Sequence, residues 1–110
     1  MNKVKTNELI SKGFEVKNGK WYYKGRPCLI DFYADWCQPC KTQETVLSEL
    51  KKSYSDMEFY KVNVEEEYEL AEIFSIKSLP TIIVCGKEEP KTFIGFTTKQ
   101  KIDDAIKKIS

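Results

Sequence analysis

Residues 37–40 read Cys-Gln-Pro-Cys, and two thiols at this spacing suit three kinds of chemistry. Such a pair can supply half of a zinc site, close a small structural disulfide, or exchange disulfides with another molecule. Zinc is disfavoured, because the sequence has no second C-x-x-C pair and no histidine. A static disulfide across four residues constrains the unfolded chain little and so adds little stability. The spacing therefore favours a redox-active pair, with no metal.

Composition narrows the class of protein further. The 110 residues are 41% hydrophobic and 32% charged, which fits one globular domain over residues 1–110. Eighteen basic and seventeen acidic residues leave a net charge of +1, so charge gives no reason to expect nucleic acid or an anionic membrane as a partner. The apolar runs are too short to span a membrane, and residues 1–20 hold no apolar signal segment. We expect a cytoplasmic protein, although a chain already trimmed of an export signal would look the same.

The elements that must position the two cysteines follow from the hydrophobic pattern. Residues 28–33 (CLIDFY) form a nearly continuous apolar run, which is typical of a central strand buried on both faces. Apolar residues at helical spacing predict a helix over 39–53, in whose first turn Pro39 is tolerated. The cysteine pair is therefore expected at a junction between a strand and a helix.

The rest of the chain predicts an α/β fold. In the segment 1–27 we expect a short helix that ends at Gly13 and a hairpin turn at Asn18-Gly19. The remaining pattern predicts strands over 57–64, 81–85 and 91–96, and helices over 66–74 and 98–109. Helical crossovers require parallel strands, whereas the short 86–90 connection requires an antiparallel pair. Together they predict a mixed central sheet flanked by helices on both faces.

At the junction between strand and helix, the two cysteines are expected to have different roles in the reaction. At a helix N-terminus, Cys37 faces unpaired backbone N–H groups, which stabilise its thiolate and lower its pKa. Cys37 is therefore expected to attack a substrate disulfide, and Cys40, one turn later, to release the reduced substrate from the mixed disulfide. Asp31 lies inside the buried strand, where burial raises the pKa of a carboxyl group, so it should exchange a proton near neutral pH.

The segment DFYADWCQPCK resembles the active site of the thioredoxin family, and the resemblance extends from about Cys28 to the end of the chain. Supporting matches are Lys61 in YKVNV, Leu79-Pro80-Thr81 at a strand start and Gly95 after the last strand. The resemblance implies a thioredoxin fold and a protein-disulfide reductase that uses no cofactor. It also implies that Asp31 accepts a proton from Cys40, with Lys61 as its neighbour.

The resemblance further implies a surface that binds substrate around the cysteines. Trp36 would cover the site, and a loop with a cis proline would hold an extended substrate segment through main-chain hydrogen bonds. The implied binding residues are Trp36, Gln38, Pro39, Ile76, Leu79, Pro80, Ile94, Gly95 and Phe96. For Ile76 and Ile94, ordinary packing at a strand end is an equal alternative. The implied partners are client proteins with disulfides and a thioredoxin reductase as electron donor, with the chain itself a monomer.

Three positions depart from the commonest family pattern: Gln38 replaces a usual glycine, Thr45 a frequent helix proline and Tyr33 a frequent tryptophan. None removes a catalytic group, and without proline at position 45 the helix should run straight. Gln38 leaves the reduction potential and the set of partners open. We expect a reductase, because Pro39 precedes Cys40 where disulfide oxidants often have a histidine. The alternatives are a disulfide oxidant or isomerase, and a redox-silent binding subunit that uses the same apolar rim.

Cys28 and Cys85 lie outside the motif. In the implied topology their strands are antiparallel neighbours, and a register borrowed from the family sets Asp31 against Ile82 and therefore Cys28 against Cys85. Residues opposed in this way have Cβ atoms about 4.5–5.5 Å apart, whereas a disulfide prefers about 3.8 Å. We expect two free thiols, packed as small apolar side chains without a catalytic part.

Overall fold

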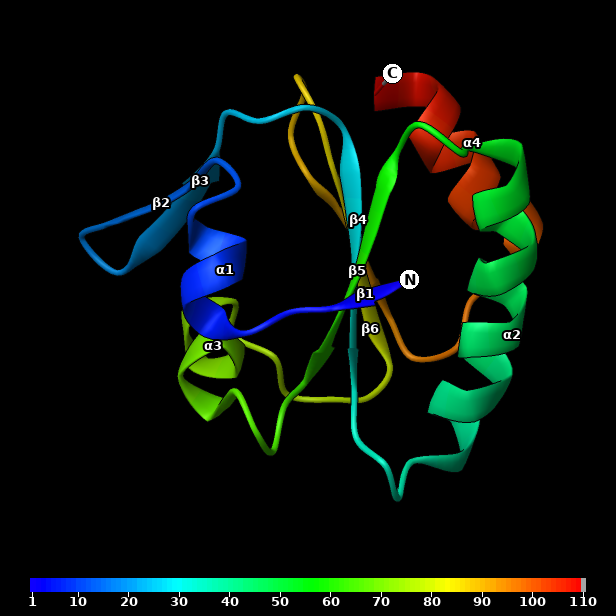
Figure 1. Cartoon of the computed structure of the whole chain (residues 1–110), viewed down its shortest axis with the longest axis horizontal. Helices are drawn as coiled ribbons and strands as arrows, with labels where there is room; N and C mark the ends of the chain where they lie inside the picture. Colours follow the sequence, from blue (N-terminus) through cyan, green and yellow to red (C-terminus); the bar gives the residue numbers. More distant parts are fainter. Residues whose placement is uncertain (110) are drawn as a thin grey trace.

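The computed structural model describes residues 1–109, which form a five-stranded sheet, a separate hairpin and four helices (Figure 1). The strands of the sheet, in spatial order, are β1 (Asn2–Lys3), β5 (Glu58–Asn63), β4 (Cys28–Tyr33), β6 (Thr81–Cys85) and β7 (Lys91–Ile94). The hairpin joins β2 (Phe14–Lys17) to β3 (Lys20–Tyr23). The helices are α1 (Thr6–Ile10), α2 (Gln38–Ser53), α3 (Tyr68–Ile73) and α4 (Lys99–Ile109).

The central strand is β4, and all six of its residues are buried. It pairs in parallel with β5 and antiparallel with β6, and β6 pairs antiparallel with β7. The crossover through α2 accounts for the parallel pair, and the short turn after Cys85 accounts for the antiparallel edge. The predicted mixed sheet is confirmed.

Helices cover both faces of the sheet, as predicted. In Figure 1, α1, α3 and the hairpin lie on one side, and α2 and α4 lie on the other. Successive β4 side chains point to opposite faces, so Ile30 and Phe32 belong to the core under α1 and α3, while Leu29 packs with residues of α2 and α4. The same alternation directs Asp31 toward α2, the helix that begins with the cysteine pair.

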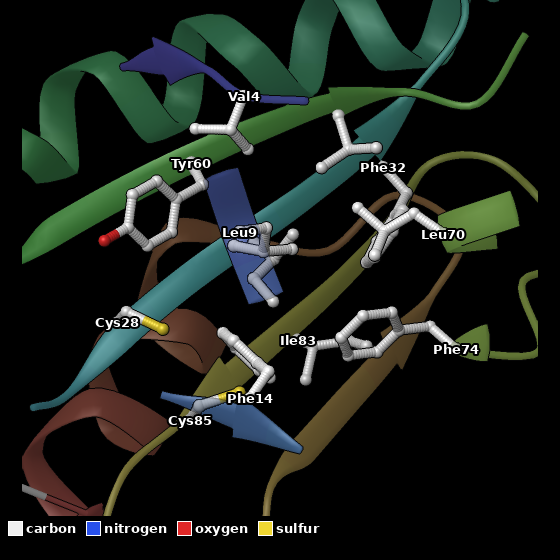
Figure 2. Packing of buried hydrophobic residues seen from close by; sticks show 12 residues of the cluster. Val4, Leu9, Phe14, Cys28, Phe32, Tyr60, Leu70, Phe74, Ile83 and Cys85 are labelled. Carbon is white, nitrogen blue, oxygen red and sulfur yellow. The ribbon is translucent and has the colours of Figure 1, made fainter. Parts of the chain in front are cut away.

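The first core cluster, shown in Figure 2, fills the space between the sheet, α1, α3 and the hairpin. Phe14 of the hairpin contacts Phe74, with ring centroids 5.6 Å apart, and Phe32 also contacts Phe74, at 5.3 Å. The hairpin is therefore held by aromatic packing, although it forms its own two-stranded sheet. Its turn has positive φ at both Asn18 (53°) and Gly19 (74°), the geometry that an Asn-Gly pair favours in a two-residue hairpin.

Helix α2 runs without interruption from Gln38 to Ser53 through Thr45. Thr45 keeps the backbone N–H that a proline would lack, and its Oγ1 donates to the carbonyl of Lys41 at 3.4 Å. The helix is therefore unbroken at Thr45, and the straightness of its axis stays a prediction.

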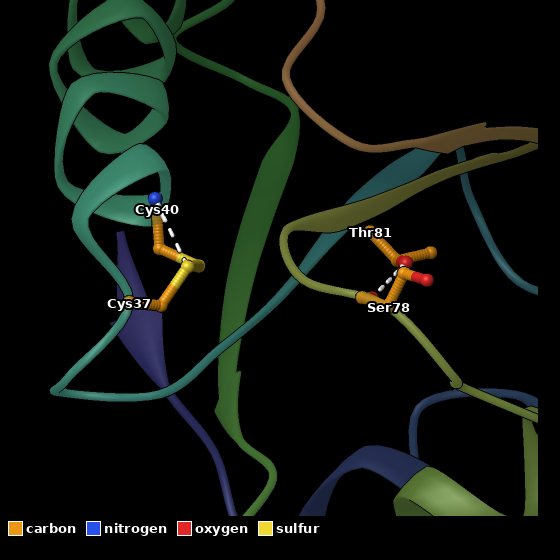
Figure 3. The surroundings of a disulfide bond; sticks show 4 residues. All are labelled: Cys37, Cys40, Ser78 and Thr81. Atoms are coloured by element: carbon orange, nitrogen blue, oxygen red, sulfur yellow. Dashed lines mark hydrogen bonds between the residues drawn. A yellow bond between two sulfur atoms is a disulfide. The ribbon is translucent and has the colours of Figure 1, made fainter.

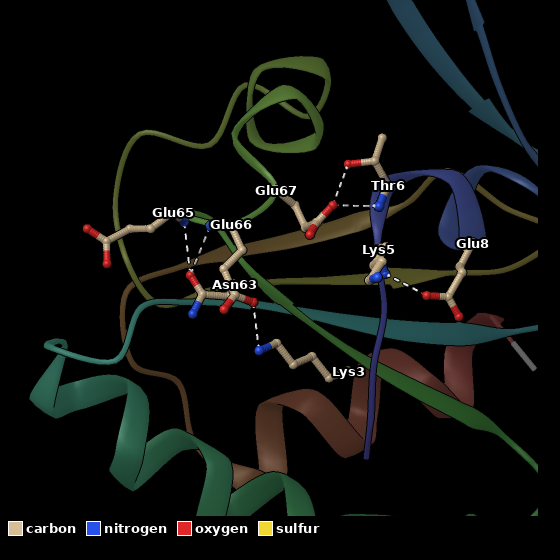
Figure 4. A network of polar contacts seen from close by, with 8 residues as sticks. All are labelled: Lys3, Lys5, Thr6, Glu8, Asn63, Glu65, Glu66 and Glu67. Carbon is tan, nitrogen blue, oxygen red and sulfur yellow. Dashed lines mark hydrogen bonds and ion pairs between the residues drawn. The ribbon is translucent and has the colours of Figure 1, made fainter.

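The short strand β1 was not predicted from the sequence. It pairs in parallel with β5, and polar contacts around it tie the N-terminal segment to the turn after β5 (Figure 4). Lys3 Nζ lies 2.6 Å from Glu66 Oε1, and Thr6 donates to Glu67 Oε1 from its backbone N–H at 2.8 Å and its hydroxyl at 2.9 Å. Backbone pairing and these contacts place β1 without any apolar residue of its own.

Candidate active site

Cys37 and Cys40 form a disulfide where α2 begins (Figure 3). Their Cα atoms are 5.3 Å apart, and both residues are buried. Cys37 occupies the N-cap position, and its Sγ accepts a hydrogen bond from the Cys40 backbone N–H at 3.2 Å. A backbone N–H aimed at Cys37 Sγ, at the positive end of a helix, favours negative charge on this sulfur.

Asp31 is the buried acid of the site, with 1% of its surface exposed. Its Oδ1 has no hydrogen-bond partner within residues 1–109. Burial, and to a smaller extent the charge of Glu44, raise the pKa of Asp31 to about 7, while Lys61 acts in the opposite direction. A carboxyl group with this pKa can both accept and release a proton near neutral pH.

Lys61 lies beside Asp31 in the paired strands β5 and β4. Its ammonium is 2.8 Å from Glu44 Oε1 of α2 and sits over the ring of Tyr33, 4.6 Å from the centroid. Burial alone lowers the pKa of Lys61, but the hydrogen bond and charge of Glu44 outweigh it and the net pKa is raised. The Lys61 ammonium is therefore a fixed positive charge that interacts with the half-exposed carboxylate of Glu44 and with the buried Asp31.

The loop before β6 contains a cis peptide bond between Leu79 and Pro80, as the resemblance implied. Leu79 packs against the cluster that contains both cysteines, which brings this loop to the disulfide. Thr81 Oγ1 donates to the Ser78 carbonyl at 2.7 Å, and the Gly95 N–H donates to the Pro80 carbonyl at 2.8 Å. Both ends of the loop are thereby fixed, and Gly95 supplies the positive φ of 82° that this junction requires.

The other predicted binding residues divide into two groups. Trp36, Ile94 and Phe96 are large apolar side chains with exposed fractions of 68%, 74% and 48%, and Gln38 and Pro39 are exposed on the first turn of α2. Ile76 instead packs, partly buried, against the core cluster under α1 and α3. Trp36 thus lies directly before the cysteine pair and Ile94 and Phe96 lie at and just after the end of β7, while Ile76 has a packing contact of its own.

Comparison with known proteins gives a consistent result. The family model described as Thioredoxin matches residues 8–108. A thioredoxin of Borreliella burgdorferi is 39% identical over 106 residues, which is 91% of this chain and 89% of that protein, and one of Buchnera aphidicola is 35% identical over 96% and 95%. The X-ray structure of Fasciola hepatica thioredoxin superposes with a TM-score of 0.76 at 25% identity, covering 100% of both chains.

The chain belongs to the thioredoxin family. Its mixed sheet with helices on both faces is the thioredoxin fold. Thioredoxins are protein-disulfide reductases, and the Cys37–Cys40 disulfide gives this chain the redox-active pair that a thiol-disulfide oxidoreductase needs.

Two residues that hold this thioredoxin site together were missed from the sequence. Gln43 is fully buried on α2 and makes two hydrogen bonds to Thr97, one donated to its carbonyl at 3.1 Å and one accepted from its N–H at 2.8 Å. This pair fixes the segment that carries Phe96 to the helix that carries the cysteines. Its signal was present, because Gln43 shares the core-facing helical spacing of Leu47 and Leu50.

Glu44 is the second missed residue. It follows Cys40 by one helical turn, so it lies on the same side of α2 as the cysteine that faces the sheet. Its ion pair with Lys61 could not be inferred from the sequence alone, because it depends on how α2 lies across β5.

Metal clusters and membrane-spanning helices are both absent from the part of the chain that the structure describes. Within residues 1–109 no group of three or more histidine, cysteine, aspartate or glutamate side chains could hold a metal ion. None of the helices in the same range is long and apolar enough to cross a membrane.

Proposed function

We propose that this protein reduces client disulfides by a two-step exchange at Cys37 and Cys40. Cys37 thiolate attacks one sulfur of the client disulfide, and the other client sulfur leaves as a thiolate. Cys40 thiolate then attacks Cys37 Sγ and expels the reduced client, leaving the Cys37–Cys40 disulfide. The observation that carries the proposal is the place of this disulfide, with Cys37 at the N-cap of α2 and its sulfur facing the Cys40 N–H.

Asp31 is the proposed proton acceptor for Cys40. It is buried on the face of β4 that α2 covers, its Oδ1 is unpaired within the described chain, and its pKa of about 7 suits proton exchange at neutral pH. Lys61 is the proposed electrostatic partner of this acid, since it neighbours Asp31 in the sheet and bears a fixed positive charge.

The client is proposed to bind as an extended segment beside the cis Leu79–Pro80 bond. Backbone groups of such a loop can pair with a client main chain and accept many sequences. Trp36, Gln38, Pro39, Ile94, Gly95 and Phe96 supply the surrounding surface in this proposal, and Ile76 supports it from the core side. Exposed apolar side chains at this place favour contact with the apolar residues of a client.

The further partners follow from family membership. We propose a thioredoxin reductase as the electron donor, disulfide-containing proteins as clients, and a cytoplasmic monomer as the working form. The whole chain, residues 1–110, is proposed to act as one domain without a cofactor, a metal or a nucleic-acid partner.

Reduction of insulin by dithiothreitol tests the proposal. The wild-type chain at catalytic concentration is expected to accelerate cleavage of the interchain disulfides and hence precipitation of the B chain. A redox-silent binding subunit would leave the rate at that of dithiothreitol alone, so the absence of acceleration would refute the reductase function.

Replacement of Glu44 tests how the acid is tuned. Glu44→Gln removes a negative charge that raises the pKa of Asp31 and frees Lys61 to interact with Asp31, and both effects lower that pKa. We expect the pH midpoint of turnover to move toward acid by about half a pH unit. The measurement is the pH profile of insulin reduction between pH 5.5 and about 8.5, the window around the pKa of about 7.

The matched control is Glu49→Gln, which removes the same charge from an exposed position on the same helix. The control profile should coincide with the wild-type profile. Equal shifts in both variants would show a general charge effect and contradict the specific effect of Glu44 on the pKa of Asp31.

A further inference from the structure

A second pair of thiols lies at the opposite end of β4 from the active site. Cys28 is the first residue of β4 and Cys85 the last residue of β6, and the register sets them directly opposite each other, as the family resemblance implied. Both are free thiols, exposed by 1% and 0%. Figure 2 shows both side chains projecting from the same face of the sheet into one core cluster.

The two thiols differ in their surroundings. Cys28 lies directly opposite Cys85 in the register, and the neighbouring Cys85 thiol lowers the pKa of Cys28 against the opposing effect of burial. The hydrogen bond with Cys28 and burial raise the pKa of Cys85. Cys28 is therefore the more nucleophilic partner, and Cys85 is placed to react with whatever forms on its sulfur.

We propose that Cys28 and Cys85 form a second, reversible disulfide when the protein meets a peroxide. The Cys28 sulfur attacks one peroxide oxygen, the O–O bond breaks, and Cys28 sulfenic acid and one water form from hydrogen peroxide. The Cys85 sulfur then attacks the sulfenic sulfur, the S–O bond breaks, and a second water leaves. The two thiols lose two electrons and two protons in total, and the peroxide takes up both.

Cys28 and Cys85 lie too far from the active-site disulfide to exchange with it directly. Six residues of β4 at about 3.3 Å each separate Cys28 from the active-site end, a span of roughly 17 Å between the first and last Cα atoms. Direct exchange between the two pairs is therefore excluded within one folded chain, so oxidation of the second pair needs a separate oxidant, which this proposal takes to be a peroxide.

The register also makes the bond easy to reduce again. Directly opposed residues in an antiparallel pair have Cβ atoms about 4.5–5.5 Å apart, more than the roughly 3.8 Å of a relaxed disulfide. Closing the bond must draw the two strand ends together, and a disulfide formed under such strain is more readily reduced than a structural one. The Cys28–Cys85 pair is therefore suited to reversible oxidation.

The test uses a Cys37→Ser, Cys40→Ser double variant, in which Cys28 and Cys85 are the remaining cysteines. The folded variant is treated with hydrogen peroxide, denatured, alkylated and weighed by mass spectrometry. We expect both alkylation sites to be lost together, a mass lower by two hydrogens, and full recovery of both sites after dithiothreitol. Circular dichroism before treatment verifies that the variant is folded.

Adding Cys85→Ser to this background gives the control. Without the resolving thiol, Cys28 should gain oxygen and form no internal bond. Three results in the double variant would each overturn the proposal. Both thiols could remain available for alkylation, either sulfur could gain oxygen without a bond between the two, or a disulfide could form between two chains.

Discussion

Cys37→Ser is expected to reduce insulin turnover to the rate of dithiothreitol alone, because the variant lacks the sulfur that forms the mixed disulfide. Cys40→Ser should also stop turnover, but at a later step. It keeps the attacking sulfur at the N-cap of α2 and lacks the thiol that releases the client. Incubation with an oxidised client followed by non-reducing electrophoresis should show a stable mixed disulfide with Cys40→Ser and none with Cys37→Ser.

The control for these variants is the double variant Cys28→Ser, Cys85→Ser, which removes both thiols at the far end of β4 and keeps Cys37 and Cys40. Its turnover should equal that of the wild type. Loss of activity in this control, or trapping by Cys37→Ser, would contradict the assignment of the chemistry to Cys37 and Cys40.

Asp31→Asn is expected to slow release of the client by on the order of 100-fold at neutral pH, the usual contribution of a positioned general base. The amide keeps the size of the side chain but cannot accept the proton of Cys40. Single-turnover kinetics should show fast formation and slow decay of the mixed disulfide. Unchanged decay between pH 6 and about 8 would refute the role, since this window surrounds the pKa of about 7.

The same variant should be at least as stable as the wild type, and this separates a lost base from a damaged fold. The pKa of Asp31 is raised from 3.8 to about 7 on folding, so the native state holds the proton more tightly than the unfolded state does. The contribution of Asp31 to wild-type stability therefore falls as pH rises from about 4 to 7 and is then level. Urea unfolding should show a gain for Asp31→Asn that grows over this window to a few kcal/mol and stays constant above it.

The sequence predicted those parts of the fold in which local pattern and burial agree. CLIDFY and TIIVC are buried strands because nearly every residue in them is apolar, whereas the register between them was taken from the family resemblance and is the one observed. Strand β1 had no such signal, because Asn2 and Lys3 are polar and exposed. Its place is determined by backbone pairing with β5 and by the ion pair of Lys3 with Glu66, which are contacts between distant parts of the chain.

The site likewise contains some residues that could be found from the sequence and others that could not. Cys37, Cys40 and Asp31 could be found because a motif and a buried acid are visible in the sequence. Glu44 could not, since a glutamate on a helix is most often a solvated residue and its partner Lys61 is 17 positions away on another element. The cis Leu79–Pro80 bond was inferred from resemblance rather than from composition, because local sequence leaves most X–Pro bonds trans.

The reduction potential of the Cys37–Cys40 couple tests the central claim most directly. It is measured in glutathione or dithiothreitol buffers on the Cys28→Ser, Cys85→Ser variant, so that a single couple titrates. Pro39 before Cys40 and the absence of histidine predict about −230 to −280 mV, toward the reducing end of a scale on which thioredoxin itself is a reference protein. A value near −120 mV would instead identify a disulfide oxidant and contradict the assignment as a reductase.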